Sequence, residues 1–260
     1  MPILRPALAG LIFLLATLAV AQITALQDAR KSGFEFMGPS TQAMQKDDGL
    51  NPAMLFVKDG DALWQKPAGQ SNKACISCHG PAELSMKGVA VRYPAFDDVL
   101  KRPIGLSQRI NQCRVKHQQA SSLRAESPDL LSLESYVAMQ SRGLPIAPPA
   151  DPRLEPFRKA GEQRFMQRMG QLNLSCAQCH DANAGGKLGA SVIPQAHPVG
   201  YPVYRLEWQA MGSLQRRLRN CMSGVRAEPY AYGGDELIEL ELYLNKRAKG
   251  MLGETPGVRP

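Results

Sequence analysis

The sequence lacks three features that would place it in other classes of protein. After residue 21 it has no apolar run of the roughly 20 residues that a membrane helix needs, so no membrane span is expected in the mature chain. The alternation of apolar and polar residues that marks β-strands is scarce. No nucleic-acid-binding motif appears, so nucleic acid is not an expected partner. These absences leave a mainly helical protein that works outside the bilayer.

The first 21 residues have the pattern of a secretory signal. Arg5 supplies a positive start, residues 9–21 are apolar apart from Gly10 and Thr17, and the segment ends in the small-x-small triplet Ala-Val-Ala. We therefore predict that residues 1–21 are a signal peptide and that the mature chain is exported. The alternative is a retained N-terminal anchor.

The chain is basic. Removal of residues 1–21 takes away one charged residue, Arg5, so the formal charge falls from +8 to +7. A basic exported protein favours anionic substrates or acidic partners. The alternative is a basic surface that is simply solvated.

Four of the six cysteines belong to two Cys-x-x-Cys-His motifs, CISCH at Cys75–His79 and CAQCH at Cys176–His180. This pattern attaches a c-type haem, because the two thiols form thioethers and the histidine ligates the iron. A redox dithiol or half of a zinc site would share the Cys-x-x-Cys part. Two copies that both end in histidine, in an exported chain, favour two haem c groups.

The sequence repeats itself around these motifs. Tyr-Pro pairs begin twenty residues before Cys113 and twenty residues before Cys221, and residues 106–113 align without gaps on residues 214–221. A repeat of about a hundred residues with its own haem motif indicates a duplicated domain. We predict a leader at 22–50, domains at 51–146 and 153–252, a Pro-rich linker at 147–152, and a loose tail at 253–260.

Each repeat is expected to close with an amphipathic helix. Apolar residues recur at spacings of three and four in both repeats, at Leu130, Leu133 and Val137 and at Leu237, Leu240 and Leu244. A further helix is expected between Leu154 and Met169. The predicted fold is mainly α, with two tandem cytochrome c-like domains.

A haem iron held by His79 or His180 needs a ligand on its other face. Cys113 and Cys221 occupy equivalent positions in the two repeats, which favours thiolate ligation of both irons. His117, His197 and several methionines are alternative ligands. An exported protein would also tolerate a disulfide between Cys113 and Cys221.

Residues 216–221 (RRLRNC) place a cluster of arginines before Cys221. Arg217 precedes the cysteine by four residues, so the two side chains share a face if the segment is helical. A guanidinium suits oxyanions and favours a nearby thiolate. Arg109 is the counterpart in the first repeat, where Gln108 and Asn111 replace Arg216 and Arg219. The alternative places Arg216 and Arg219 on a solvated helix face or at haem propionates.

These motifs together resemble the SoxA family, the dihaem subunits of the SoxAX cytochromes of bacterial thiosulfate oxidation. The resemblance covers nearly all of the mature chain. It implies periplasmic L-cysteine S-thiosulfotransferase activity, in which thiosulfate is joined to a carrier cysteine (SoxYZ) and two electrons pass to haem. It also implies a small monohaem partner, SoxX.

The resemblance further implies a role for each site residue. The first haem would be attached to Cys75 and Cys78, with His79 and Cys113 as axial ligands. The second would be attached to Cys176 and Cys179, with His180 and Cys221 as axial ligands. Cys221 would also be the catalytic persulfide, and Arg217 would bind thiosulfate.

Two other functions fit the same residues. A dihaem electron carrier would use Cys113 and Cys221 only to tune the reduction potential. A sulfur-compound oxidoreductase would couple two thiosulfates to tetrathionate without a carrier protein.

Overall fold

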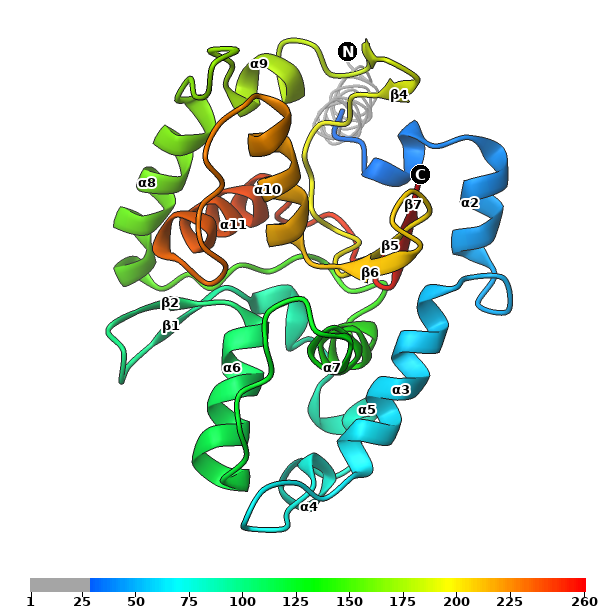
Figure 1. Cartoon of the computed structure of the whole chain (residues 1–260), viewed down its shortest axis with the longest axis vertical. Helices are drawn as coiled ribbons and strands as arrows, with labels where there is room; N and C mark the ends of the chain where they lie inside the picture. The colour runs from blue at the N-terminus through cyan, green and yellow to red at the C-terminus, as the bar shows by residue number, and fades with distance from the viewer. Residues whose placement is uncertain (1–28) are drawn as a thin grey trace, which may run out of the picture. The chain divides into compact units, whose positions relative to one another are not determined.

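The computed structural model describes residues 29–260 (Figure 1). The chain divides into the units Met1–Lys31 and Ser32–Pro260, and the fold described below is that of the second. The predicted signal peptide and residues 22–28 of the predicted leader lie outside the described residues. No helix between residues 29 and 260 has both the length and the apolar character needed to cross a membrane.

The elements before the predicted linker are mostly helices. They are η1 (Gly33–Phe36), α2 (Pro39–Lys46), α3 (Ala53–Gln65), α4 (Cys75–His79), α5 (Ala82–Ser85), η2 (Ala90–Arg92), β1 (Ala95–Asp97), β2 (Arg102–Ile104), α6 (Leu106–Cys113), the π-helical η3 (Arg114–Gln118) and α7 (Pro128–Met139). The predicted closing helix of the first repeat is therefore present as α7.

The second repeat follows the same order. Its elements are η4 (Pro152–Leu154), α8 (Glu155–Met166), α9 (Cys176–His180), β3 (Lys187–Leu188), β4 (Ser191–Val192), β5 (Val203–Arg205), β6 (Ala210–Gly212), α10 (Leu214–Gly224), α11 (Asp235–Arg247) and β7 (Gly257–Arg259). The predicted helices before the second motif and at the close of the repeat are present as α8 and α11. The prediction of a mainly helical duplication is confirmed.

Each repeat is built on one close helix crossing. Helix α3 packs on α7, and α8 packs on α11. At the crossings Gly60 lies against the backbone of Ser132, and Gly161 lies against the backbone of Glu239, with no room for a Cβ atom at either glycine. Glycine is needed at both positions because only its bare Cα lets two helix backbones approach this closely.

The two repeats bury equivalent side chains beside their haem motifs. In the first, Trp64, Tyr136 and Val137 form a buried cluster that packs on Cys75. In the second, the corresponding cluster contains Phe165, Tyr243 and Leu244 and packs on Cys176. Burying these large side chains removes apolar surface from water, which stabilises each repeat and forms the wall behind each motif.

The hairpins that precede α6 and α10 share one register. Ala95 pairs with Ile104 and Asp97 with Arg102, whereas Val203 pairs with Gly212 and Arg205 with Ala210. All four pairs of equivalent residues are 108 positions apart, but Cys75 and Cys176 are 101 apart. The second repeat is therefore seven residues longer between its haem motif and its hairpin, where the small hairpin of β3 and β4 lies.

The two repeats pack as parts of one compact unit rather than as separate bodies. The Gly143 amide donates a 2.8 Å hydrogen bond to the Gly253 carbonyl, and the Ile146 amide donates one of the same length to the Met251 carbonyl. The Asn245 side chain donates to the Tyr93 carbonyl at 2.5 Å. The predicted linker, residues 147–152, contains no helix or strand until η4 begins at Pro152.

The prediction of a loose tail at 253–260 is wrong. Strand β7 pairs in parallel with β5, and Val258 is fully buried opposite Tyr204. The prediction of a weakly structured leader is also wrong for residues 33–46, which form η1 and α2. Helix α2 lies beside β7 (Figure 1), and the Val258 amide donates to Oε1 of Gln45 at 2.9 Å. Helix α2 and strand β7 therefore stabilise each other. Neither segment has a hydrophobic periodicity of its own from which its structure could be predicted.

The helix crossings give a stability prediction. Replacing Gly161 with alanine forces α8 and α11 apart, and we expect a loss of about 1–3 kcal/mol in the free energy of unfolding. Denaturant titration of the haem-loaded protein would measure it. Gly224, which is exposed at the end of α10 with open space around it, is the matched control, because alanine there creates no clash. Equal stability of the two variants would contradict a tight crossing.

Candidate functional site: two thiol and imidazole pockets

The first haem motif opens onto a cavity of about 500 Å³, named here the first-repeat cavity. Cys75, Cys78 and His79 from α4 line it together with Cys113 from α6. In α4 the two cysteines are three residues apart and the histidine follows at the next position, so one short helix presents all three side chains to one side. The structure therefore brings together the four residues predicted at the first haem.

The first-repeat cavity suits a flat apolar group with a metal at its centre. Two free thiols, an imidazole and a third thiol converge there, and apolar side chains complete the wall, among them Trp64, Met86, Val89, Leu106, Ile110, Leu133 and Val137. Burial raises the pKa of the thiols of Cys75 and Cys113. His117, the alternative ligand, also lines this cavity.

The second repeat places His180 against Cys221. Helix α9 begins with a capping box in which Ser175 and Gln178 hydrogen-bond to each other's backbone amides, and it ends at His180. Nδ1 of His180 donates to the Pro194 carbonyl at 2.7 Å, which leaves Nε2 as the ring atom able to bind a metal. The same ring hydrogen-bonds to Cys221 of α10.

The six cysteines all lie in the described residues, and none is in a disulfide. Cys113 lines the first-repeat cavity, whereas Cys221 lies beside His180. Each of these two thiols is therefore placed with the histidine of its own repeat, and the structure contains no Cys113–Cys221 disulfide.

The two repeat-equivalent thiols differ in acidity. Burial acts to raise the pKa of Cys221, but the hydrogen bond from His180 and the positive charges of Arg217 and Arg205 outweigh it, so the pKa lies below the ordinary value. Burial raises the pKa of Cys113 despite the charge of Arg109. Nearby positive charge thus favours the thiolate more at Cys221 than at Cys113.

The three arginines before Cys221 differ in their contacts. Segment 216–221 is helical, within α10, as the spacing required. Arg216 stacks on Trp208, with its guanidinium carbon 4.1 Å from the ring centre, and Arg219 stacks on Tyr232 at 4.4 Å and donates to the Tyr230 carbonyl. Within residues 29–260, no hydrogen bond, ion pair or aromatic ring engages the Arg217 guanidinium. Arg217 is therefore the arginine of this cluster whose donors remain available at Cys221.

The counterpart arginine of the first repeat is neutralised. Arg109 makes a 2.9 Å ion pair with Asp97, whose side chain is 3% exposed, and donates to the Tyr93 hydroxyl at 3.2 Å. Backbone donation from Leu100, with Gln112, Arg109 and Val99, lowers the pKa of Asp97 against the opposing effect of burial, so the carboxylate is charged. Arg109, the counterpart of Arg217, is therefore engaged, and the other guanidinium at the first-repeat cavity is that of Arg114, the residue after Cys113.

Sequence reasoning missed two residues of these sites, Asp97 and Arg205. They occupy equivalent hairpin positions, 108 residues apart, inside the stretch whose length from the Tyr-Pro pair to the cysteine is the same in both repeats. The signal for them is the exchange of Asp97 for Arg205 at equivalent positions. It is found only when the two repeats are compared beyond the few residues next to each cysteine.

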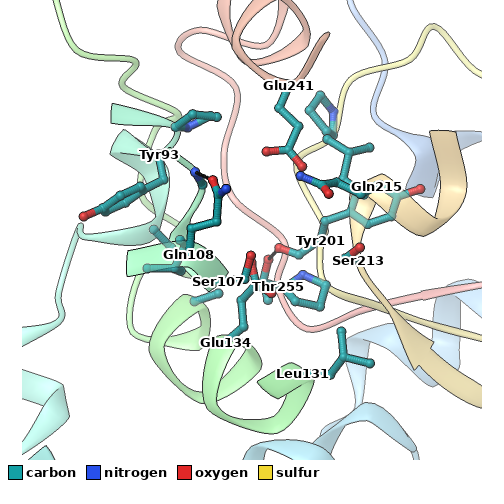
Figure 2. A pocket seen from close by; sticks show the side chains of 18 of the residues that line it. Tyr93, Ser107, Gln108, Leu131, Glu134, Tyr201, Ser213, Gln215, Glu241 and Thr255 are labelled. Carbon is teal, nitrogen blue, oxygen red and sulfur yellow. Dashed lines mark hydrogen bonds between the residues drawn. The ribbon is translucent and has the colours of Figure 1, made fainter. Parts of the chain in front are cut away.

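A different cavity, of about 320 Å³, lies between the repeats and contains none of the six cysteines (Figure 2). Glu241 enters it from α11 and Glu134 from α7, at equivalent repeat positions, and no lysine, arginine or histidine lines it. Burial, with the charges of Glu241 and Glu126, raises the pKa of Glu134 to about 8. Burial raises that of Glu241 to about 7. This cavity is acidic and distinct from the haem motifs.

Two helical repeats, each with a Cys-x-x-Cys-His turn and a further cysteine, define a c-type cytochrome with two haem-attachment motifs. The family model for the SoxA/TsdA cytochrome c domain matches residues 59–146 and 160–252. The chain belongs to the SoxA/TsdA cytochrome c family.

Relatives and a solved structure agree with this assignment. The L-cysteine S-thiosulfotransferase subunit SoxA of Pseudaminobacter salicylatoxidans is 36% identical over 233 residues, which are 89% of this chain and 82% of the relative. The same subunit of Rhodovulum sulfidophilum is 33% identical over 89% of this chain and 81% of its own. The crystal structure of SoxXA from P. pantotrophus superposes with a TM-score of 0.86 at 32% identity, covering 92% of this chain and 90% of that one.

The acidic cavity gives a pH prediction. Glu134 and Glu241 have pKa values above the ordinary 4.5 in the folded state, so their contribution to stability is complete below about pH 4.5 and is lost as the pH rises through 7 and 8. We expect the free energy of unfolding to fall on the order of a few kcal/mol between pH 5 and pH 8.5. Denaturant titrations across this range would measure the slope.

The variant Glu134→Gln should flatten that slope, because glutamine takes up no proton. Gln substitution of Glu162, which is exposed on α8, is the control and should leave the slope unchanged. A slope that is the same in all three proteins would contradict protonation of Glu134 in the folded state.

Proposed function

We propose that this chain is the dihaem subunit of a periplasmic L-cysteine S-thiosulfotransferase, which oxidatively joins thiosulfate to a cysteine of a sulfur-carrier protein. One observation carries the proposal. Cys221 is held against His180 while the unengaged guanidinium of Arg217, one helical turn away on α10, lowers the pKa of its thiol. Acidic thiols beside an anion-binding group are the arrangement that sulfur-transfer chemistry requires.

Two haem c groups are held by equivalent residues. Cys75 and Cys78 would attach the first haem, and His79 and Cys113 would bind its iron. Cys176 and Cys179 would attach the second haem, and His180 and Cys221 would bind its iron. The convergence of the first set on one apolar cavity and the contact of His180 with Cys221 support these roles.

The reaction needs an electron acceptor at the sulfur. A carrier thiolate and thiosulfate together lose two electrons when a sulfur–sulfur bond forms between the carrier sulfur and the outer sulfur of thiosulfate. When bound, the haem irons would supply the acceptors for those two electrons, one electron for each Fe(III). The protein's own part is to hold the two sulfurs together and to keep the site cationic.

Arg217 binds the sulfonate end of thiosulfate. A guanidinium offers a planar fork of donors that matches two oxygens of an oxyanion. With that end fixed, the outer sulfur faces Cys221, the proposed catalytic persulfide. Loss of two electrons joins the outer sulfur to the Cys221 sulfur, and the carrier thiolate then attacks the outer sulfur and releases Cys221 as its thiolate. This edge of the second repeat must therefore be reachable by the carrier.

The partners follow from the same proposal. A SoxX-like monohaem subunit forms a heterodimer with this chain, as the match to the SoxXA structure suggests. A SoxYZ-like protein presents the accepting cysteine. Association with the SoxX-like subunit and transfer to the carrier both take place in the periplasm, which agrees with the signal peptide predicted from the sequence.

The proposal is tested by peptide mass mapping of Cys221 in protein purified without reductant. We expect an added sulfur on the Cys221 peptide, and we expect it to change when thiosulfate and carrier are supplied. An unmodified Cys221 under all conditions would favour a dihaem electron carrier. Turnover of thiosulfate to tetrathionate without any carrier would favour the sulfur-compound oxidoreductase.

A pair of variants separates binding from catalysis. Arg217→Ala removes the sulfonate donors, and we expect at least a tenfold loss in kcat/KM for thiosulfate, because a hydrogen bond to a charged group contributes about 1.5–3 kcal/mol. Both haem spectra should persist. Arg219→Ala is the matched control, since Arg219 lies two residues further along α10 and faces Tyr232. Equal turnover in the two variants would rule out a thiosulfate-binding role for Arg217.

A further inference from the structure

One position of the repeated hairpin changes the sign of its charge between the two repeats. Asp97 ends β1 and Arg205 ends β5, at the same register and the same separation from Arg109 and Arg217. In the first repeat the carboxylate binds the arginine of α6 at 2.9 Å. In the second repeat the equivalent position carries the guanidinium of Arg205 in place of a carboxylate.

The surroundings of Arg205 leave part of its guanidinium without a partner. Its side chain is 12% exposed, and one terminal nitrogen lies 3.1 Å from Glu207, whose own side chain is 51% exposed. The ring centre of Trp208 lies 5.1 Å from the guanidinium carbon. The Nε–H group is buried and has no hydrogen-bond partner. A buried, unpartnered donor on a charged group is costly unless a ligand supplies the acceptor.

Arg205 lies near Arg217. Their counterparts Asp97 and Arg109 are in contact at 2.9 Å from the same register, and burial and the charge of Arg217 lower the pKa of Arg205. Glu207 is the carboxylate paired with Arg205, and Arg217 has none. The second-repeat hairpin thus adds a cation next to Arg217, whereas the first-repeat hairpin places a carboxylate on Arg109. The other arginine of the first-repeat cavity, Arg114, follows Cys113 in the chain, where the second repeat has Met222.

We propose that Arg205 is a second substrate-binding residue, which with Arg217 clamps the oxyanion end of thiosulfate at Cys221. Asp97 occupies the corresponding place in the first repeat and excludes the anion from Cys113. One charge exchange between equivalent hairpin positions thereby directs the substrate to the second haem. This inference rests on the proposed function and adds to it a residue that sets the site's specificity.

Two oxyanions are possible occupants of a cationic pocket beside a haem, the sulfonate of the substrate and a haem propionate. Two observations favour the substrate. The counterpart of Arg205, Asp97, binds the arginine that precedes the first-repeat thiol by one helical turn, which places Arg205 on the Arg217 side of the second site. In the first repeat the equivalent position carries a carboxylate, so this place in the repeat does not need a cation to hold a haem.

The test compares Arg205→Asp and Arg205→Lys with the unaltered protein, each as the haem-loaded complex. Arg205→Asp recreates the ion pair of the first repeat, and we expect the KM for thiosulfate to rise about 10- to 100-fold while kcat changes less. Arg205→Lys keeps the charge but not the fork, so its KM should rise only a few-fold. Sulfate, a dianion without the outer sulfur, should inhibit the unaltered protein competitively and Arg205→Asp much more weakly.

Two controls separate this effect from charge and packing. Arg142→Asp makes the same change in charge at an exposed ion pair with Asp48, and its KM should not move. Glu207→Gln removes the existing partner of Arg205 and should leave KM unchanged or lower it. A KM that rises equally in Arg142→Asp would overturn the inference.

The remaining outcomes each decide one proposal. An unchanged KM in Arg205→Asp and Arg205→Lys overturns the clamp while the proposed function stands. A shifted reduction potential of the second haem with unchanged KM assigns Arg205 to a propionate and also overturns it. If the unaltered complex turns over no thiosulfate, the proposed function fails. Calorimetric titration with sulfate then still tests the clamp, since binding lost in Arg205→Asp supports it and binding retained overturns it.

Discussion

The close approach of two helices at a glycine is the constraint on which each repeat depends. Gly60 and Gly161 let α3 and α8 lie directly on the backbones of α7 and α11. That distance packs Trp64, Tyr136 and Val137 into one cluster beside the first-repeat cavity, and it sets Phe165 against Tyr243 with ring centres 5.3 Å apart in the second repeat. The wall behind each haem motif is therefore a consequence of backbone packing, and it is shared by both repeats.

Within this common frame the repeats differ in charge rather than in geometry. Hairpin register and the spacing from tyrosine to cysteine are kept, yet the arginine one turn before the first thiol pairs with a buried carboxylate, and the arginine one turn before the second has a cation at the equivalent place. An ion pair holds an arginine in place and occupies its donors. One exchange of a carboxylate for an arginine therefore changes the charge of two otherwise similar sites.

Much of this arrangement could be predicted from the sequence, because the haem motifs and the 3.6-residue periodicity of α7 and α11 are long or specific signals. The four-residue spacing of Arg217 and Cys221, which predicts a shared helix face, is another specific signal. The two- and three-residue strands could not be predicted, since no period can be seen in so few residues. Val258 lies between Gly257 and Arg259, with a proline two residues away on each side, and it is buried because β5 and α2 enclose it. The direction in which Arg216 and Arg219 turn depends on Trp208 and Tyr232, which are distant in any linear pattern.

The parallel pairing of β7 with β5 has a consequence for the order of assembly. Arg205 ends β5, and its strand neighbour Arg259 belongs to a segment that follows both haem motifs and every helix in the chain. The haem motifs are local turns, whereas Arg205 is held in place only when this C-terminal segment docks on β5. The motif turns therefore do not depend on the C-terminal segment, but the cationic side of the second site does.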